Sequence, residues 1–183
     1  MKDFKKVLSV FVVIVSAVLM SGCSPMKSMM GIVFGTDDDI AYGNQLWQKM
    51  DEKGFNTVNS SIHVGTEPHG NILEVIEGKI DGKTVIVKRN YRGDGLTVEQ
   101  VEQNRQKYLK AITVMAKREA GYDSDNQDWF WVKYKSDGTY FNKMGMIPMV
   151  GRVAKGKEIG CIACHAKSSN YRFTPKSMIK ELP

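Results

Sequence analysis

Two cysteines and a histidine near the end of the chain have the spacing of a covalent cofactor attachment site. Cys161 and Cys164 are three residues apart, and His165 follows directly. On one helical turn, side chains at such spacings lie on the same face. The two thiols can then form thioether bonds to the vinyl groups of a c-type haem, while the imidazole ligates the iron. The motif predicts one covalently attached haem c with His165 as an axial ligand.

The residue on the other axial face of the iron decides what such a haem can do. Only 18 residues follow His165, and Met178 is the one methionine among them. A methionine more often fills a core than ligates iron, and a lone histidine more often has a hydrogen-bonding role. The upstream candidates are Met115, Met144, Met146, Met149, His63 and His69. The sequence favours an open, five-coordinate iron, with a six-coordinate electron carrier as the alternative.

The chain begins like a bacterial secretion signal. Three lysines precede an apolar run of 14 residues, Val7–Met20, and the small residues and cysteine of LMSGC complete the pattern. This run is shorter than the roughly 17–25 residues of a membrane-spanning helix. Its basic, apolar and small segments follow the order of a signal peptide. We therefore expect residues 1–22 to be removed on export.

Cys23 lies where a lipoprotein signal has its lipidated cysteine, because LMSGC resembles the bacterial lipobox. Lipidation would make residues 23–36 a tether between lipid and domain. Ser24 favours an extracytoplasmic location on the outer membrane, facing the periplasm. Ordinary signal cleavage and an uncleaved anchor are the alternatives. With one cysteine lipidated and two bonded to haem, no thiol is left for a disulfide.

The composition fits one domain, residues 37–183, of mildly basic character. The formal net charge of the whole chain is +6, and the charges are scattered. Clusters of Lys and Arg with interleaved aromatic residues, which would indicate nucleic-acid binding, are not found in the sequence. Attraction to an anionic membrane surface is the simpler interpretation of the charge.

The residue pattern predicts an α+β fold: a mainly antiparallel β-sheet with an N-terminal helix and a short C-terminal haem-bearing helix. Residues 36–54 have acids at the start, a periodic apolar face and a final glycine, as in a packed helix. Residues 71–91 contain two β-branched runs joined by Asp-Gly, which predicts a hairpin. A short polar surface helix, two strand regions and an irregular stretch are expected at 96–110, 110–119, 128–141 and 144–160.

Period-two alternation assigns the side chains of the expected strands to faces. It places Lys88 and Arg89 on opposite faces, with Ile86 beside the first and Val87 beside the second. In the same way, Trp129 and Trp131 share one face, and Phe130 takes the other. Aromatic residues on strands are usually core residues. We expect at least one of the three to touch the haem edge, and Tyr171 and Phe173 to pack on the proximal side.

Four segments resemble, in content and in order, the family that contains cytochrome P-460 and cytochrome c′-beta. They are TVIVKRNY, ITVMAKREAGYD, QDWFWVKYKSDGTY and GCIACHAKSSNYRFTP, and the resemblance covers roughly residues 55–175. The combination of DWFW with the NYRFT tail is more specific than the haem motif alone. The resemblance implies a mainly antiparallel sheet, a homodimer, and one c-type haem with a proximal histidine and an open distal site.

The resemblance also implies candidate residues on the distal side. In the hydroxylamine-oxidising members a lysine is bonded to the haem macrocycle, and the matching position is Lys88. These enzymes use a distal carboxylate to move protons, and Thr113 lies at or near that position. Threonine is a poor proton acceptor at neutral pH, and Arg89 replaces an acid common in relatives. Both departures count against hydroxylamine turnover and leave haem binding unaffected.

Three functions follow from this interpretation. The first is oxidation of hydroxylamine or nitric oxide, with electrons passing to a soluble cytochrome. The second is reversible binding of nitric oxide or carbon monoxide without turnover, as in the c′-beta type. The third is simple electron transfer, with His69 or a methionine as sixth ligand. Whether the protein is an enzyme stays open at this point.

Overall fold

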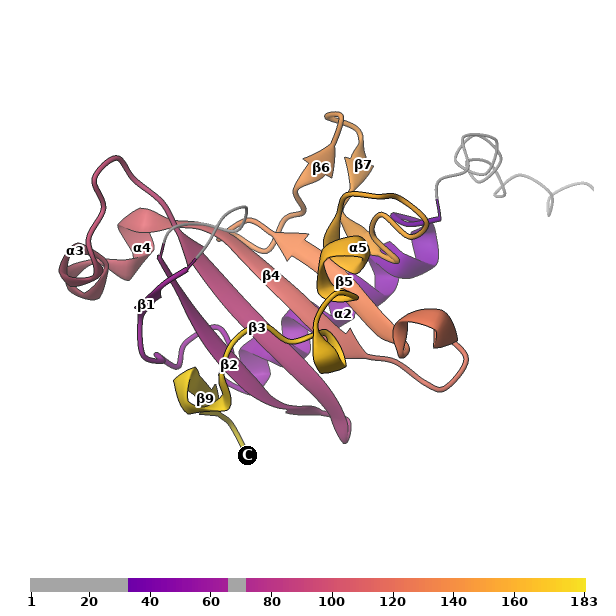
Figure 1. Cartoon of the computed structure of the whole chain (residues 1–183), viewed down its shortest axis with the longest axis horizontal. Coiled ribbons are helices and arrows are strands. Elements are labelled where there is room, and N and C mark those ends of the chain that lie inside the picture. The colour runs from indigo at the N-terminus through magenta and orange to yellow at the C-terminus, as the bar shows by residue number, and fades with distance from the viewer. Residues whose placement is uncertain (1–32, 66–71) are drawn as a thin grey trace, which may run out of the picture. The chain divides into compact units, whose positions relative to one another are not determined.

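A seven-stranded sheet with one long helix packed behind it makes up most of the structure, a computed structural model (Figure 1). It describes residues 33–65 and 72–183. The expected signal peptide, the lipidation candidate Cys23 and the possible ligand His69 lie outside the described residues. The predicted α+β class, with a mainly antiparallel sheet, is confirmed.

The strands follow the order β1-β2-β3-β4-β5-β8, and all these neighbours are antiparallel. The last strand, β9, lies parallel to β2, and β6 and β7 form a separate two-stranded sheet. The strands are β1 (His63–Val64), β2 (Ile72–Ile80), β3 (Lys83–Tyr91), β4 (Leu109–Lys117), β5 (Trp129–Tyr134), β6 (Asn142–Lys143), β7 (Ile147–Pro148), β8 (Val150–Gly151) and β9 (Ile179–Glu181). The helices are α2 (Asp37–Glu52), α3 (Val98–Gln103), α4 (Arg105–Tyr108) and α5 (Cys161–His165), with 3₁₀ turns η1 (Ser124–Asn126), η2 (Ser169–Tyr171) and η3 (Lys176–Met178).

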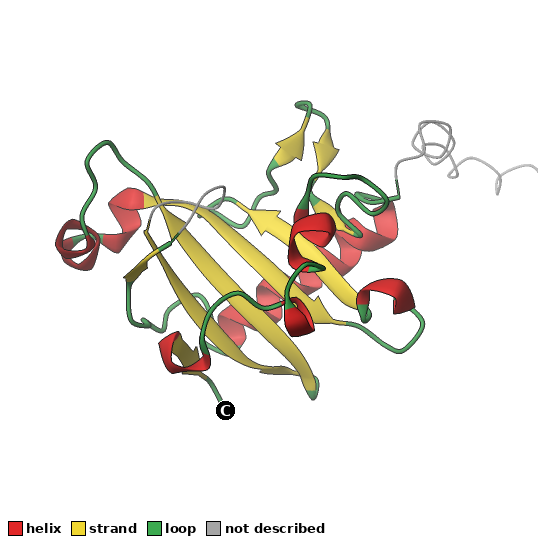
Figure 2. Cartoon of the chain, in the orientation of Figure 1, coloured by secondary structure: helices red, strands yellow, loops and turns green. Residues whose placement is uncertain are grey.

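Helix α2 confirms the predicted N-terminal helix and covers one face of the sheet (Figure 2). Thr36 and Asp39 form a capping box: the Asp39 N–H donates to Thr36 Oγ1 over 3.1 Å, and the Thr36 N–H donates to Asp39 Oδ2 over 3.2 Å. This pairing satisfies two N–H groups that a helix start otherwise leaves without partners. Leu46 and Met50 on the inner face of α2 are buried against the strands.

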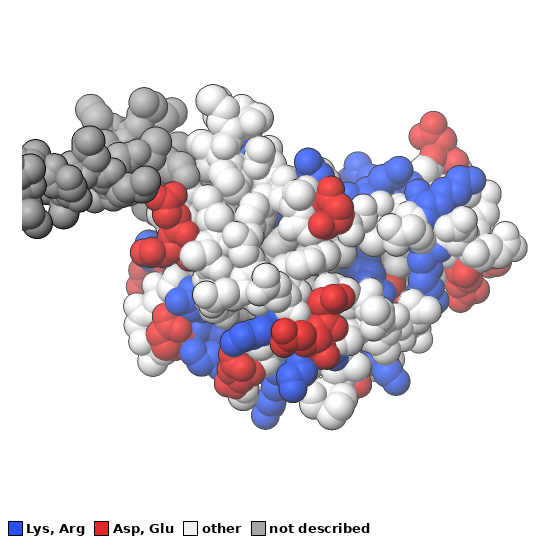
Figure 3. Space-filling view, turned by 180° about the vertical axis from the view of Figure 1, so that it is seen from behind, with Lys and Arg blue, Asp and Glu red and all other residues white. Residues whose placement is uncertain are grey.

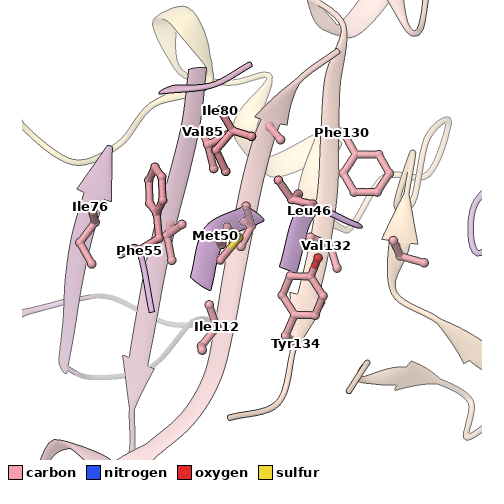
Figure 4. Close-up of a cluster of buried hydrophobic side chains, with 14 residues drawn as sticks. Leu46, Met50, Phe55, Ile76, Ile80, Val85, Ile112, Phe130, Val132 and Tyr134 are labelled. Atoms are coloured by element: carbon pink, nitrogen blue, oxygen red, sulfur yellow. The ribbon is translucent and has the colours of Figure 1, made fainter. Parts of the chain in front are cut away.

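The main core lies between α2 and the sheet (Figure 4). Alternate positions of β3, β4 and β5 point toward the helix, as the alternation predicted for β3 and β5. Phe130 is fully buried there, and Tyr42 meets it edge-on at 4.6 Å between ring centroids. The other core members include Phe55, Ile76, Ile80, Val85, Val87, Ile112, Val114, Val132, Tyr134 and Val150. The other side chains of these strands point to the opposite face of the sheet.

The predicted hairpin of residues 71–91 is confirmed as β2 and β3. Asp81 and Gly82 both have positive φ, 52° and 74°. Two consecutive left-handed residues make the tight turn whose twist matches the flanking strands, which explains the Asp-Gly sequence. Ile80 therefore pairs with Lys83, and the register continues without a shift to Ile72 opposite Tyr91.

A buried ionic cluster joins the sheet to the loop that follows α2. The Glu74 side chain is inaccessible to solvent and accepts hydrogen bonds from Arg89 Nη1 at 2.9 Å and Arg105 Nη1 at 3.0 Å. Tyr91 Oη donates to the same carboxylate, and the Ser60 N–H donates to it over 2.7 Å. Arg89 thus anchors its strand from the helix side, where it also donates to two backbone carbonyls.

Three predicted elements differ in extent from the structure. The predicted polar helix begins at a capping box, but Asn104 divides it into α3 and α4. Its Val101 is fully buried against Ile72 and Tyr91. The second strand of residues 128–141 is reduced to a single bridge between Tyr134 and Tyr140. The stretch expected to be irregular, 144–160, contains β7 and β8. Each difference depends on contacts with distant parts of the chain.

Basic and acidic side chains are interspersed over the α2 side of the molecule (Figure 3). Within residues 33–65 and 72–183, no helix combines the length and apolar character needed to cross a bilayer.

Candidate haem site

A cavity of about 540 Å³ lies on the sheet face opposite α2. Cofactor pockets typically enclose about 300–1,000 Å³. Strands β3, β4 and β5 supply its floor, while α5 and the segments on either side of it supply the roof (Figure 1). Cys161, Cys164 and His165 all line this cavity, so the three residues of the motif predicted from sequence face one common space.

Gly160 determines how the chain enters the motif. Its φ of +146° is a value that residues with side chains rarely adopt, and a Cβ there would lie 2.2 Å from Ala154 Cβ. The close approach turns the chain directly into α5, which confirms the predicted short C-terminal helix. Cys161 and Cys164 are not joined in a disulfide.

His165 is held by one backbone contact and two aromatic rings. Its Nδ1 lies 2.7 Å from the carbonyl oxygen of Tyr171. Because a carbonyl only accepts, Nδ1 carries the proton, and Nε2 is the ring nitrogen that can ligate a metal. Trp131 and Phe173 meet the imidazole edge-on at 4.8 and 5.1 Å between centroids. Burial lowers the pKa of His165, which favours the neutral, ligating form.

Lys88 and Thr113, the two predicted distal residues, are direct neighbours in the sheet. The register pairs Val75 with Lys88, Lys88 with Thr113, and Thr113 with Lys133, in one row across β2, β3, β4 and β5. All four residues line the cavity. The Thr113 hydroxyl lies 3.4 Å from the Lys88 carbonyl and accepts from Asn90 Nδ2 at 3.3 Å. Its bonding capacity is therefore largely used within the sheet.

Lys88 is a partly buried amine with no carboxylate partner among the described residues. Burial lowers its pKa to about 8, and the Cys161 and Cys164 thiols offset only part of this effect. A lysine with such a pKa is deprotonated in a substantial fraction of molecules near neutral pH. The neutral amine is the nucleophilic form, as a bond to another group requires.

Replacing Lys88 with Met should stabilise the haem-free chain in a pH-dependent way. The unfolded lysine keeps its proton up to about pH 10.4, whereas the folded one loses it near pH 8. The unfolded state therefore binds more protons between these values, and wild-type stability rises with pH through that window. We expect Lys88→Met to be more stable than wild type at pH 7, by at most on the order of 3 kcal/mol, and equal to it near pH 10.5.

Urea denaturation at several pH values measures this difference in free energy of unfolding. Lys143→Met, at another lysine of the cavity lining, is the matched control. A difference between Lys88→Met and wild type that does not change from pH 7 to pH 10.5 would contradict the lowered pKa.

The candidate sixth ligands separate into two groups. Met115 and Met149 line the cavity. Met144 and Met146 are exposed by 76% and 74% at the tip of the β6–β7 hairpin, and neither they nor Met178 line the cavity. His63 pairs with Leu73 at the edge of the sheet and is likewise not part of the lining. Among the described residues, only two thioether side chains therefore face the cavity as possible sixth ligands.

Several charged residues of the cavity were not recognised in the sequence. Lys133 lies on the same strand face as Trp131, so the alternation that placed the tryptophans could have revealed it. Lys143, Lys167 and Arg172 come from outside the main sheet and gave no such signal. Glu158 is the one carboxylate among the described residues of the lining.

These residues fit a c-type haem. The lining offers two thiols and an imidazole on one side and apolar strand residues on the other. It also holds five basic side chains, which suit the two carboxylates of a haem. Trp131 Nε1 is buried in the cavity wall with no hydrogen-bond partner in the described part of the chain, as expected where a partner group belongs.

Comparisons with models of known protein families, with curated proteins and with solved structures found no match. The assignment of a function to this protein therefore rests on the cavity geometry and the sequence motifs.

Proposed function

We propose that this protein is a c-type haem protein of the cytochrome P-460 and cytochrome c′-beta kind that binds or oxidises small nitrogen compounds. The observation that supports it most is the convergence of Cys161, Cys164 and His165 on one cavity whose opposite wall offers no histidine among the described residues. Haem c, when bound, supplies an iron that can take up a small ligand and exchange electrons. Cys161 and Cys164 anchor it, and His165 ligates the iron through Nε2.

The residues of the sheet face determine what happens opposite His165. Ile86 and Met115 give this wall apolar side chains beside Lys88 and Thr113, whereas Trp131 lies against the His165 ring. Lys88 extends from the same wall and is the candidate for a covalent bond to the haem, since burial favours its neutral amine. Such a bond is the distinguishing feature of the enzymes that oxidise hydroxylamine or nitric oxide.

Reversible binding of nitric oxide or carbon monoxide is the second candidate function. It is favoured by Thr113, whose hydroxyl bonds within the sheet and is a poor base. Proton removal during oxidation would require another acceptor, and Glu158 is exposed on the loop before α5. Electron transfer is the third candidate and would need a sixth ligand, either His69, which lies outside the described residues, or a methionine such as Met115 or Met149 of the cavity lining.

The cellular location, the redox partner and the oligomeric state of the protein are part of the same proposal. Lipidation at Cys23 would hold the domain at the outer membrane, facing the periplasm. An oxidising enzyme there would pass electrons to a soluble cytochrome. A homodimer is expected from the family resemblance.

An absorption spectrum of the haem-loaded protein, oxidised and then reduced with dithionite, separates the three functions. A strongly red-shifted reduced Soret band that Lys88→Ala abolishes would support a cross-linked enzyme. A normal five-coordinate, high-spin spectrum would support the gas-binding protein, with nitric oxide as the first ligand to titrate. A low-spin six-coordinate spectrum would support electron transfer.

Lys133→Ala is the matched control for this experiment, because Lys133 occupies the same row of the sheet. A red-shifted band that persists in Lys88→Ala would exclude Lys88 as the cross-linking residue. Failure of the exported protein to acquire any haem would contradict the proposed function as a whole.

A further inference from the structure

The carbonyl oxygen that meets His165 belongs to a segment with unusual backbone conformation. Asn170 and Tyr171 both have left-handed φ, 56° and 60°. Such values are uncommon for residues other than glycine, particularly for a large aromatic one. They persist where the surrounding structure holds them in place. The 2.7 Å contact between Tyr171 O and His165 Nδ1 therefore depends on whatever fixes the Tyr171 side chain.

The Tyr171 side chain is anchored on a turn located 45 residues earlier in the sequence. Only 7% of Tyr171 is exposed, and its hydroxyl lies 3.3 Å from Asn126 Oδ1 and 3.5 Å from the carbonyl oxygen of Asp125 in the same turn, so either can accept its proton. Asn126 in turn donates through Nδ2 to Asp123 Oδ2 at 2.9 Å. Asp123 is 3% exposed and forms an ion pair with Lys155. The backbone N–H of Asp123 also donates to Asp128 Oδ1 at 2.8 Å, which closes the turn.

These contacts form one continuous chain from a partly exposed ion pair to the iron-ligating ring. Buried polar groups are costly without partners, so each member limits the positions of the next. A shift of the turn that holds Asn126 and the Asp125 carbonyl would release the Tyr171 hydroxyl, and the strained backbone of residues 170–171 could then relax. Relaxation would move the carbonyl oxygen away from His165 Nδ1.

We propose that Asp123 and Asn126 are positioning residues for the axial ligand: through Tyr171 they keep a backbone carbonyl at His165 Nδ1 and thereby set the electron donation of the imidazole. This inference rests on the proposed haem function. A hydrogen bond from Nδ1–H to a strong acceptor raises the basicity of the ligating nitrogen. It thus strengthens the iron–histidine bond and favours ferric over ferrous iron. Weakening the chain should lower the iron–histidine stretching frequency and raise the reduction potential.

The test compares Tyr171→Phe and Asn126→Ala with wild type in the haem-loaded full chain. Resonance Raman spectra of the ferrous protein give the iron–histidine frequency, and redox titration gives the potential. Tyr140→Phe is the matched control, because it removes a hydroxyl that bonds to Ile40 O and Asn44 on the other side of the molecule. We expect a lower frequency and a higher potential in both test variants and no change in Tyr140→Phe.

Unchanged frequency and potential in both test variants would overturn the inference, and so would an equal change in Tyr140→Phe. If Asn126→Ala does not fold, Lys155→Met weakens the same chain from its partly exposed end. It should move both quantities in the same direction by a smaller amount; no movement would count against the proposal.

Nitrogen-15 NMR of His165 in the haem-free chain separates this inference from the proposed function. Haem staining reports on the function alone, whereas the protonated nitrogen of His165 reports on the contact. In wild type the proton should reside on Nδ1, and Tyr171→Phe should shift the tautomers toward Nε2–H. An Nδ1 proton that is equally favoured in Tyr171→Phe would contradict the positioning role, whether or not haem binds.

Discussion

Replacing Cys161 and Cys164 together with alanine should remove all covalently held haem, whereas the wild-type chain should keep one haem through denaturing electrophoresis. A thioether bond survives unfolding, but a haem held by an axial histidine and packing is lost when the cavity opens. The two sulfur atoms line the cavity beside His165, and no other cysteine lies within the described residues. This is the largest effect expected of any substitution here. Haem staining of the gel measures it.

Two further variants make this result specific to the motif. Each single replacement should leave one thioether, so haem staining persists with a shifted pyridine haemochrome band. His165→Ala should retain the covalent haem and lose the spectrum of an iron ligated by histidine. Haem that resists denaturation in the double variant would show that attachment occurs elsewhere. A five-coordinate, histidine-ligated spectrum in His165→Ala would disprove the assignment of the proximal ligand.

Replacing Arg89 with Met should give the largest loss of stability, about 3 kcal/mol in the free energy of unfolding. Removing one partner of a buried ion pair typically costs about 3–5 kcal/mol, because the remaining charge keeps its desolvation penalty. Glu74 would still be paired with Arg105, which places the effect at the lower end. Arg89 also donates to the carbonyls of Phe55 and Val58, and these acceptors would be left buried.

Urea denaturation with a matched control measures this loss. Lys83→Met removes an exposed ion pair with Glu119, which should change stability by less than about 1 kcal/mol. The double variant Arg89→Met and Glu74→Gln should be less destabilised than the sum of the two single variants, since it removes the unpaired charge. If Arg89→Met unfolds at the same urea concentration as Lys83→Met, the buried cluster does not hold the sheet as described.

The elements that depend on local sequence were predicted well. The acidic start of α2, the capping box of Thr97 and Gln100 before α3, and the Asp-Gly turn between β2 and β3 involve residues within a few positions of each other, so their pattern is visible in the sequence. Alternation assigned Lys88, Arg89 and Phe130 to the correct faces, because successive side chains of a strand point in opposite directions. The register pairs Thr113 with Lys88, while its role on the distal side stays a prediction.

The elements that depend on distant partners were not predicted. Strand β9 exists because the chain after α5 crosses the sheet and pairs with β2, where Arg172 also binds Glu77 through two contacts of 2.9 Å. The division of the second predicted helix at Asn104 and the short strands β7 and β8 likewise follow from packing. A local pattern contains little information on which edge a returning segment will meet.

The sequence by itself determined the chemistry available to this protein: two thiols and an imidazole on one helical turn, a lysine on a strand, and a sheet with two distinct faces. Only the tertiary structure decided how that chemistry is arranged. It placed Lys88 in a row with Thr113 and Lys133, and it brought Asn126 to Tyr171, whose carbonyl oxygen contacts His165. The physical reason is that spacing along a chain fixes neighbours within a helix turn or strand, whereas burial, desolvation and hydrogen bonding across the sheet arise from residues tens of positions apart.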